Sequence, residues 1–181
     1  MTSSPPLSLA MIEPEIAGNV GAMLRTAACL EIGVHLVEPC GFAFGDAALR
    51  RAGMDYAADA LLRRHVDRSA FLGHMDSTGA RLILLSTSGA IDLYAVRFMA
   101  GDVIAVGSEG SGAPQNIHDA AALRVRIAIK PGLRSLNVSV AAAIALAEAR
   151  RQLAAPVYGW ERPGNAPVYG WERPGKMTGG Q

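Results

Sequence analysis

The chain has 181 residues, of which half are hydrophobic and 18% are charged, and its formal net charge is +1. Such a length and composition are typical of one globular domain and exclude an intrinsically disordered protein. No apolar run reaches the roughly 20 residues that a membrane-spanning helix needs. The amino-terminal stretch lacks the basic segment of a secretory signal. Cys29 and Cys40 have no metal-binding or redox spacing, so we expect a cytoplasmic protein without a metal.

Charge is balanced along most of the chain, because residues 1–153 contain 14 basic and 14 acidic side chains. A nucleic-acid-binding protein usually has an excess of positive charge. Here the arginines occur instead in adjacent pairs, at 50–51, 63–64 and 150–151. Such pairs can form a local phosphate-binding patch without changing the total charge. Ordinary solvated arginines are the alternative, and the sequence leaves both open.

The alternation of apolar runs predicts a strand and a helix in turn along the chain. The first predicted helix begins at Asn19, a good N-cap residue, and ends at Gly33. A loop or short helix is expected at 41–56. Strands are expected at 7–12, 34–39, 61–66, 81–86, 102–107 and 123–129, and helices at 19–33, 68–76 and 138–153. This order predicts an α/β fold with a parallel sheet covered by helices on both faces.

The tail after this pattern is repetitive. The sequence APVYGWERPG occupies 155–164 and returns unchanged at 166–175, and the chain closes with KMTGGQ, which resembles the start of a common expression tag. We therefore expect a domain at 1–153 and a vector-derived or disordered tail at 154–181.

Ligands of open parallel sheets bind at the carboxyl ends of the strands, which directs attention to the loops after residues 86, 107 and 129. The second of these loops reads GSEGSGAP (107–114), and its glycines would let the backbone approach a ligand closely. It is neither G-x-G-x-x-G nor a P-loop, so a plain turn is an equal alternative. Glu109 in its middle would cap a turn or hold a cationic or hydroxyl group.

The third loop ends in RSLNVS (134–139), where three short polar side chains stand at the start of a helix. Helix capping would explain one of Ser135, Asn137 and Ser139 but not all three. We assign Ser139 to capping or packing at the helix start. In the helix after the first loop, Arg25 is either a surface side chain or an anion clamp.

These loops together carry a family resemblance. EPEIAGNVGAMLR (13–25), VGSEGSGAP (106–114) and RSLNVSVA (134–141) resemble the three motifs of the SPOUT superfamily of S-adenosylmethionine-dependent RNA methyltransferases. EPCGFAFGDAALRRAGMDY (38–56) is similar to the signature of the TrmL/YibK-type tRNA 2′-O-methyltransferases of the wobble nucleotide. The resemblance covers residues 7–153.

The resemblance implies a C-terminal trefoil knot and a homodimer, and we would not predict a knot from general topology rules. It implies S-adenosyl-L-methionine as the cofactor and the tRNA anticodon stem-loop, methylated at C34 or U34, as the partner. The implied catalytic residues are Asn19, Arg25, Glu109, Ser135 and Asn137. The implied cofactor-binding residues are Leu85, Ser86, Thr87, Gly107, Glu109, Gly112, Ile127, Ile129, Ser135 and Leu136. We assign RNA contacts to Arg50, Arg51, Arg63 and Arg64.

The chain departs from the family pattern at two places. The family usually has Thr-Arg where this chain has Gly110-Ser111, so a cation near the cofactor or RNA is missing there. The family often carries Tyr and Trp in the final helix, at the positions of Ala147 and Arg150.

That final helix, VSVAAAIALAEA (138–149), is apolar nearly all round, which fits a dimer contact and equally fits packing inside one chain. Three other functions stay open: 2′-O-methylation at another tRNA or rRNA position, a nucleotide- or NAD-binding oxidoreductase, and a non-catalytic RNA-binding module.

Overall fold

The computed structural model describes residues 6–43 and 61–153. Residues 44–56 of the loop or short helix expected at 41–56, with Arg50 and Arg51, and the tail 154–181 lie outside the described residues. The described strands are β1 (Leu7–Ile12), β2 (Gly33–Val37), β3 (Leu62–His65), β4 (Leu82–Leu85), β5 (Ile91–Asp92), β6 (Asp102–Val106) and β7 (Leu123–Arg126). The described helices are α1 (Ala17–Leu30), α3 (Arg68–Thr78), α4 (Gln115–Ala120) and α5 (Val138–Leu153), with a 3-10 turn η2 (Leu93–Ala95).

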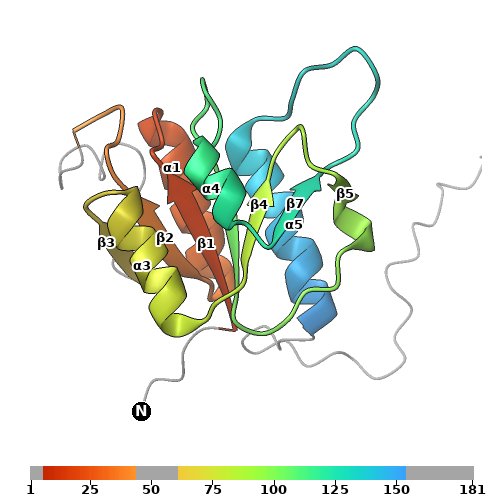
Figure 1. Cartoon of the computed structure of the whole chain (residues 1–181). Coiled ribbons are helices and arrows are strands. Elements are labelled where there is room, and N and C mark those ends of the chain that lie inside the picture. The colour runs from red at the N-terminus through yellow and green to blue at the C-terminus, as the bar shows by residue number, and fades with distance from the viewer. Residues whose placement is uncertain (1–5, 44–60, 154–181) are drawn as a thin grey trace, which may run out of the picture.

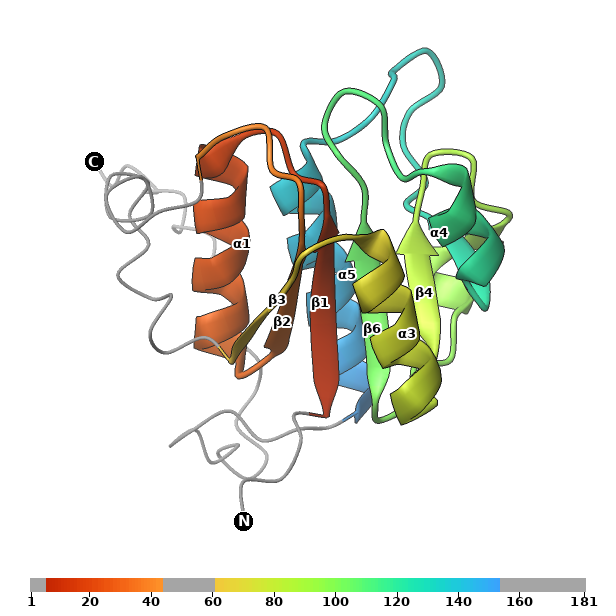
Figure 2. The same ribbon diagram turned by 60° about the vertical axis from the view of Figure 1, so that its left-hand side comes forward.

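The strands form one sheet in the order β3-β2-β1-β6-β4-β7-β5, and every described pairing is parallel. Helices α1 and α5 cover one face, and α3 and α4 cover the other (Figures 1 and 2). The predicted α/β class is therefore confirmed. Parallel strands that are buried on both faces read as continuous apolar runs, which is why most of the strands were predicted from the sequence.

Strand β1 shows how one apolar run serves two cores. Leu9 and Met11 point toward the core that contains α1 and α5, whereas Ala10 and Ile12 join the core beneath α3 and α4. All four are fully buried, and complete burial of a Leu or Ile side chain stabilises the fold by about 1.5–3 kcal/mol. The alternation follows from the two-residue period of a strand.

The boundaries of α1 differ from those expected. The helix begins two residues earlier, its N-cap is Ile16, which makes no side-chain cap, and Asn19 lies inside its first turn. The prediction of Asn19 as the cap was wrong, because its amide is engaged with other loops. The helix ends at Leu30, its C-cap Glu31 adopts a left-handed conformation (φ 55°), and Gly33 is already the first residue of β2.

Several strands are one to three residues shorter than expected, most clearly β7, which ends at Arg126 and not at residue 129. The short elements β5, η2 and α4 were not predicted, since two, three and six residues are too few to show a period. The final helix matches its prediction, 138–153. None of the described helices combines the length and the apolar character that crossing a membrane requires.

Candidate functional site

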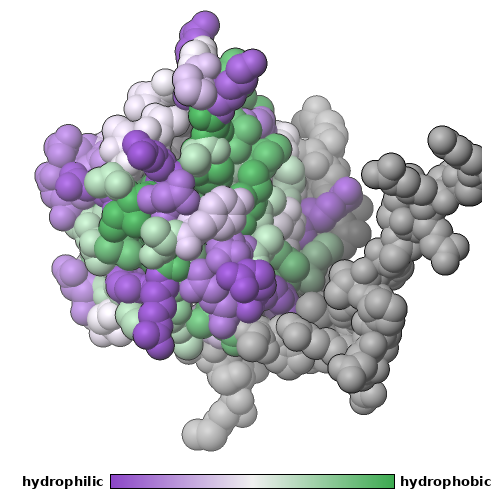
Figure 3. Space-filling model, turned by 90° about the vertical axis from the view of Figure 1, so that its right-hand side faces the viewer, coloured by the Kyte–Doolittle hydropathy of each residue, from purple (hydrophilic) through white to green (hydrophobic). Residues whose placement is uncertain are grey.

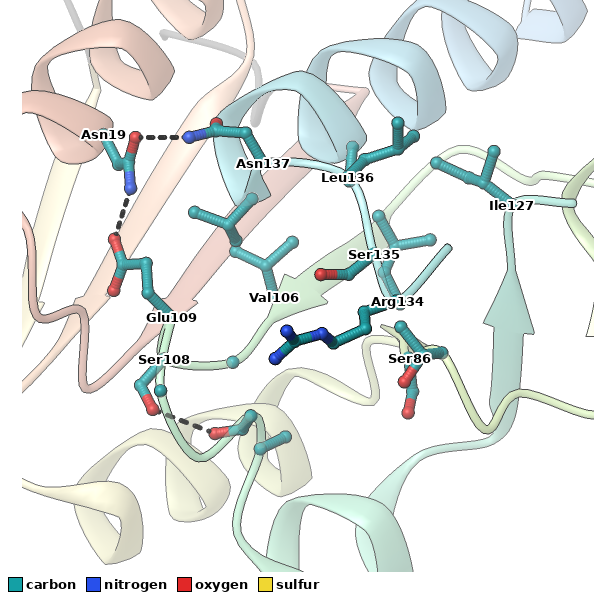
Figure 4. Close-up of a pocket in the computed structure, with 18 of the residues that line it drawn as sticks. Asn19, Ser86, Val106, Ser108, Glu109, Ile127, Arg134, Ser135, Leu136 and Asn137 are labelled. Atoms are coloured by element: carbon teal, nitrogen blue, oxygen red, sulfur yellow. Dashed lines mark hydrogen bonds between the residues drawn. The ribbon is translucent and has the colours of Figure 1, made fainter. Parts of the chain in front are cut away.

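A cavity of about 640 Å³ lies at the carboxyl ends of β4, β6 and β7, where the sequence analysis placed the ligand. Loops that are far apart in the sequence meet around it (Figure 4). This volume is in the range of small-molecule and cofactor sites. Every residue predicted to bind the cofactor lines this cavity: Leu85, Ser86, Thr87, Gly107, Glu109, Gly112, Ile127, Ile129, Ser135 and Leu136.

The loop after β6 is a tight turn. Ser108 and Gly112 exchange backbone hydrogen bonds of 3.1 Å in both directions, and Gly112 has a φ of +73°, which favours glycine. Gly107 is also required, because a Cβ there would lie 2.2 Å from backbone atoms of Gly112 and Ala113. The hydroxyls of Ser108 and Ser111 lie 2.8 Å apart and brace the turn from inside. The glycines therefore shape the turn as well as bring backbone to the cavity.

Glu109 ties two loops together at one end of the cavity. Its Oε1 accepts a hydrogen bond of 2.8 Å from Asn19 Nδ2, and its Oε2 accepts one of 2.8 Å from the backbone N–H of Glu15. Asn137 Nδ2 then donates to Asn19 Oδ1 at 3.0 Å, so the third loop joins the same chain of bonds (Figure 4). Asn19, Glu109 and Asn137, which the sequence analysis assigned to the site, are thus brought together.

Glu15 completes this junction and was not assigned a role from the sequence. Its Oε2 accepts a 3.0 Å hydrogen bond from the backbone N–H of Gly110, reciprocating the bond from Glu15 N to Glu109. A Cβ on Gly110 would lie 2.9 Å from Glu15 Oε2, so this glycine makes room for the carboxylate. No local pattern could have revealed the contact, since the residues are 95 positions apart.

Asn137 acts as the helix cap as well as a site residue. Its Oδ1 accepts from the backbone N–H of Ser139 at 2.9 Å and from the Ser139 hydroxyl at 2.7 Å. The capping alternative for Ser139 was therefore wrong, and its hydroxyl instead braces the cap. Because Oδ1 is engaged in this way, the amide nitrogen of Asn137 is directed toward Asn19. Ser135 lines the cavity from the loop, two residues before Asn137.

Another part of the wall is apolar. Leu85, Ile127 and Ile129 line it, and Leu136 covers one side with 38% of its surface exposed. On the side of the molecule that carries β5, hydrophobic residues gather below a hydrophilic tip (Figure 3). An apolar wall with polar groups at its rim suits a ligand that has a flat hydrophobic part and polar substituents, as a nucleoside has.

Not all predicted residues reach the cavity. Arg25 is exposed on α1 and does not line it. Arg63 and Arg64 lie on the edge strand β3, which β2 and β1 separate from β6. Arg64 pairs with Glu38 at 2.6 Å, and Arg63 contacts His74 at 3.1 Å.

Neither cysteine lines the cavity. Burial raises the pKa of Cys40 to about 11, with Glu38 adding to the effect, and Cys29 is a free thiol on α1. Within residues 6–43 and 61–153, no group of three or more His, Cys, Asp or Glu side chains is placed to hold a metal ion.

A parallel α/β sheet with a nucleoside-sized cavity at its carboxyl edge, closed by a Gly-rich turn and an Asn-capped helix, defines a nucleotide- or cofactor-binding α/β protein. The family is shown by sequence: residues 6–147 match the model of the SpoU rRNA Methylase family, and the chain belongs to this family.

Sequence similarity to known relatives covers nearly the whole domain. The chain is 45% identical over 146 residues to a tRNA (cytidine(34)-2′-O)-methyltransferase of Ancylobacter novellus, covering 81% of this chain and 92% of that one. It is 40% identical over 152 residues to the protein of that name in Escherichia coli K12, covering 83% and 96%.

Solved structures agree with this fold. One described as "Structural insights into the 2-OH methylation of C/U34 on tRNA" has a TM-score of 0.77 at 38% identity, covering 82% of this chain and 96% of that one. An AdoMet-bound rRNA methyltransferase of Sinorhizobium meliloti has a TM-score of 0.75 at 25% identity, covering 83% and 58%.

Proposed function

We propose that the protein is an S-adenosyl-L-methionine-dependent tRNA methyltransferase that methylates the ribose 2′-OH of the wobble nucleotide, C34 or U34. The observation that carries this proposal is the convergence of three sequence motifs on one cavity, which all ten predicted cofactor residues line. The relatives named for C34 methylation support the same activity and substrate.

The cavity residues fit this cofactor. Backbone groups of the turn at 107–112 can contact polar groups of a nucleoside, while Leu85, Ile127 and Ile129 can pack on its base. When bound, the cofactor supplies a methyl group on a positively charged sulfur, which is a good leaving group. The acidic side chain at the cavity is Glu109, whose two oxygens are held by Asn19 and Glu15.

The protein's contribution is mainly positional, since an in-line displacement depends on alignment of the reacting atoms. We assign Asn137 and Ser135 to the ribose, and Asn19 and Glu109 to holding Asn137 in place. As the methyl–sulfur bond breaks and the methyl–oxygen bond forms, Ser135 would relay the proton of the 2′-OH to solvent water. An arginine is protonated in proteins, so Arg25 does not act as the base. We assign it instead to orienting the RNA phosphate and the 2′-OH, a role that requires the bound RNA to reach Arg25, because Arg25 does not line the cavity within one chain.

A test of this assignment is Arg25→Lys. We expect the variant to bind S-adenosyl-L-methionine as the wild type does and to lose most of its turnover, because a lysine lacks the planar bidentate fork. Calorimetry measures the first and labelled methyl transfer the second. Wild-type turnover would remove Arg25 from the chemistry.

The domain extent, the path of the chain and the oligomeric state belong to the same proposal. We infer that the domain spans 1–153, contains a C-terminal trefoil knot and forms a homodimer in the cytoplasm. Support for the knot comes from β7, which lies between β4 and β5 although the segment joining those strands precedes it. Gly89 of that segment packs against the Val125–Arg126 peptide, and Gln152 of α5 bonds to Val96 and Phe98.

Labelled methyl transfer to unmodified bulk tRNA, followed by nucleoside mapping, tests the function. We expect 2′-O-methylcytidine or 2′-O-methyluridine at position 34. A methyl group at another position would support the alternative of a different tRNA or rRNA target. No transfer despite RNA binding would support a non-catalytic RNA-binding module, and binding of NAD in place of S-adenosyl-L-methionine would support an oxidoreductase.

A further inference from the structure

We propose that Arg134 is an RNA-binding residue of the site, whose guanidinium binds a phosphate of the RNA substrate next to the ribose that is methylated. This inference rests on the proposed function and adds a residue to which the motif comparison assigned no role. Arg134 precedes Ser135 in the loop between β7 and α5 and lines the cavity. Its side chain extends into the cavity, with the guanidinium lying between the Ser108 turn and the segment that carries Ser86 (Figure 4).

The charge of the cavity points to an anionic ligand at this position. Among the described lining residues, Glu109 and Arg134 carry the charges. The Glu109 carboxylate is occupied by Asn19 Nδ2 and the Glu15 N–H. Arg134 makes no hydrogen bond or ion pair with any other residue that the structure describes. A guanidinium with five unused donors at a site built for a nucleotide favours a phosphate, which it can bind through two parallel hydrogen bonds.

The opposite loop of the cavity has no cation at the position where the resembling family carries one. The resembling family usually has Thr-Arg where this chain has Gly110-Ser111. The position of the family's arginine is Ser111 here, whose short hydroxyl lies 2.8 Å from that of Ser108 and carries no charge. Arg134 reaches the cavity from the facing loop and supplies a positive charge that the turn at 107–112 lacks.

RNA is favoured over the carboxylate of the cofactor as the source of the anion. Residues 130–137 are all exposed, so the guanidinium is reached from solvent, the direction from which a large RNA arrives. Leu85 and Ile127, which also line the cavity, are apolar and offer no charge to a second anion.

The test compares Arg134→Gln with Arg134→Lys and with Arg124→Gln, an exposed arginine of β7 that does not line the cavity. Each is measured for S-adenosyl-L-methionine binding by calorimetry and for binding of unmodified bulk tRNA at several salt concentrations. For Arg134→Gln we expect tRNA binding to weaken by about 10- to 100-fold, the loss of one charge-assisted hydrogen-bonded contact. The plot of log affinity against log salt concentration has a negative slope, and its magnitude should decrease by about 0.7, as for one lost phosphate contact to a single strand.

Cofactor binding should be unchanged in Arg134→Gln, Arg134→Lys should retain most of the salt slope, and Arg124→Gln should behave as wild type. Adding Ser111→Arg to Arg134→Gln should restore part of the tRNA affinity. Weaker cofactor binding with an unchanged salt slope would overturn the proposal and assign Arg134 to the cofactor carboxylate. An unchanged slope and affinity would also overturn it. Because these are binding measurements, absence of methyl transfer by the wild type would count against the proposed function alone.

Discussion

At the scale of single residues, the site depends on polar side chains that each hold two partners. Glu109, in the loop after β6, accepts hydrogen bonds from the loop after β1 and from the first turn of α1. Asn137 caps α5 and also donates a hydrogen bond to Asn19. Such a chain of hydrogen bonds orients each member through the next. Removing one acceptor leaves a donor unsatisfied, which costs more than the bond itself contributed.

Glu109→Gln tests this junction. The amide has a single oxygen, so one of the two donors, Asn19 Nδ2 or the Glu15 N–H, loses its acceptor. We expect a loss of about 1–3 kcal/mol in the free energy of unfolding, measured by urea denaturation, together with a clear loss of methyl transfer.

The matched control is Asp76→Asn, an exposed acid-to-amide change on α3. It should leave both quantities unchanged. Full activity and stability in Glu109→Gln would mean that the junction does not organise the site.

Replacement of glycine by alanine is expected to have opposite effects on stability at Gly107 and at Gly18. Gly107→Ala places a Cβ 2.2 Å from the backbone of the turn, so the turn must shift, and we expect destabilisation on the order of 1–3 kcal/mol, as for overpacking. Gly18→Ala meets nothing within 4 Å in α1 and should stabilise by about 0.5–1 kcal/mol. Thermal and urea unfolding measure both, and a neutral Gly107→Ala would show that the turn is adaptable.

At the scale of elements, β2, β3 and α3 share a buried cluster of histidines. His35 Nδ1 and His65 Nε2 lie 2.9 Å apart, and His74 lies beside both. Burial, followed by the neighbouring His65, His74 and Arg63, lowers the pKa of His35 to about 4. Burial and the charges of His74 and Arg63 lower the pKa of His65 as well. The folded protein therefore holds these rings neutral.

This cluster predicts loss of stability in acid. Unfolded histidines titrate near 6.5, so below that pH the unfolded chain binds protons that the folded chain does not. The stabilisation is complete above pH 6.5 and is lost as the pH falls toward 4. From the shift of His35 we expect the free energy of unfolding to fall by up to about 3 kcal/mol over this range.

Urea unfolding at pH 7.5, 6, 5 and 4.5 measures the effect. His35→Phe should flatten the profile between pH 6.5 and 4.5, whereas His118→Gln, a half-buried histidine of α4 outside the cluster, should keep the wild-type slope. A flat wild-type profile would contradict the prediction.

At the scale of the whole molecule, α1 and α5 pack together on one face and leave part of their surfaces open. Val140 of α5 is 47% exposed and Ile16 before α1 is 51% exposed. These apolar positions suit the proposed homodimer, since association removes apolar surface from water. Ala142, Ala145 and Ala149 are buried inside the chain, so internal packing also explains part of the apolar character of α5.

Light scattering at micromolar concentration tests the dimer. We expect twice the monomer mass for the wild type and a shift toward monomer for Val140→Glu, which would bury a charge at the interface. Leu61→Glu, a 63% exposed apolar position beside β3, is the matched control and should remain dimeric. A monomeric wild type would rule the dimer out.

Resemblance to a known family assigned ten residues to the cofactor, and all ten line one cavity. The residue pattern of the sequence by itself determined the parallel α/β class and the end of the sheet that holds the site. It could do so because buried parallel strands read as apolar runs, and because loops at their carboxyl ends meet at one edge. Only the tertiary structure decided that Asn19 donates a hydrogen bond to Glu109 and does not cap a helix. The same is true of the hydrogen bond between Gly110 and Glu15 and of the entry of Arg134 into the cavity. Those contacts join residues about 90 or more positions apart or depend on which way a loop turns, and no local pattern of residues carries that information.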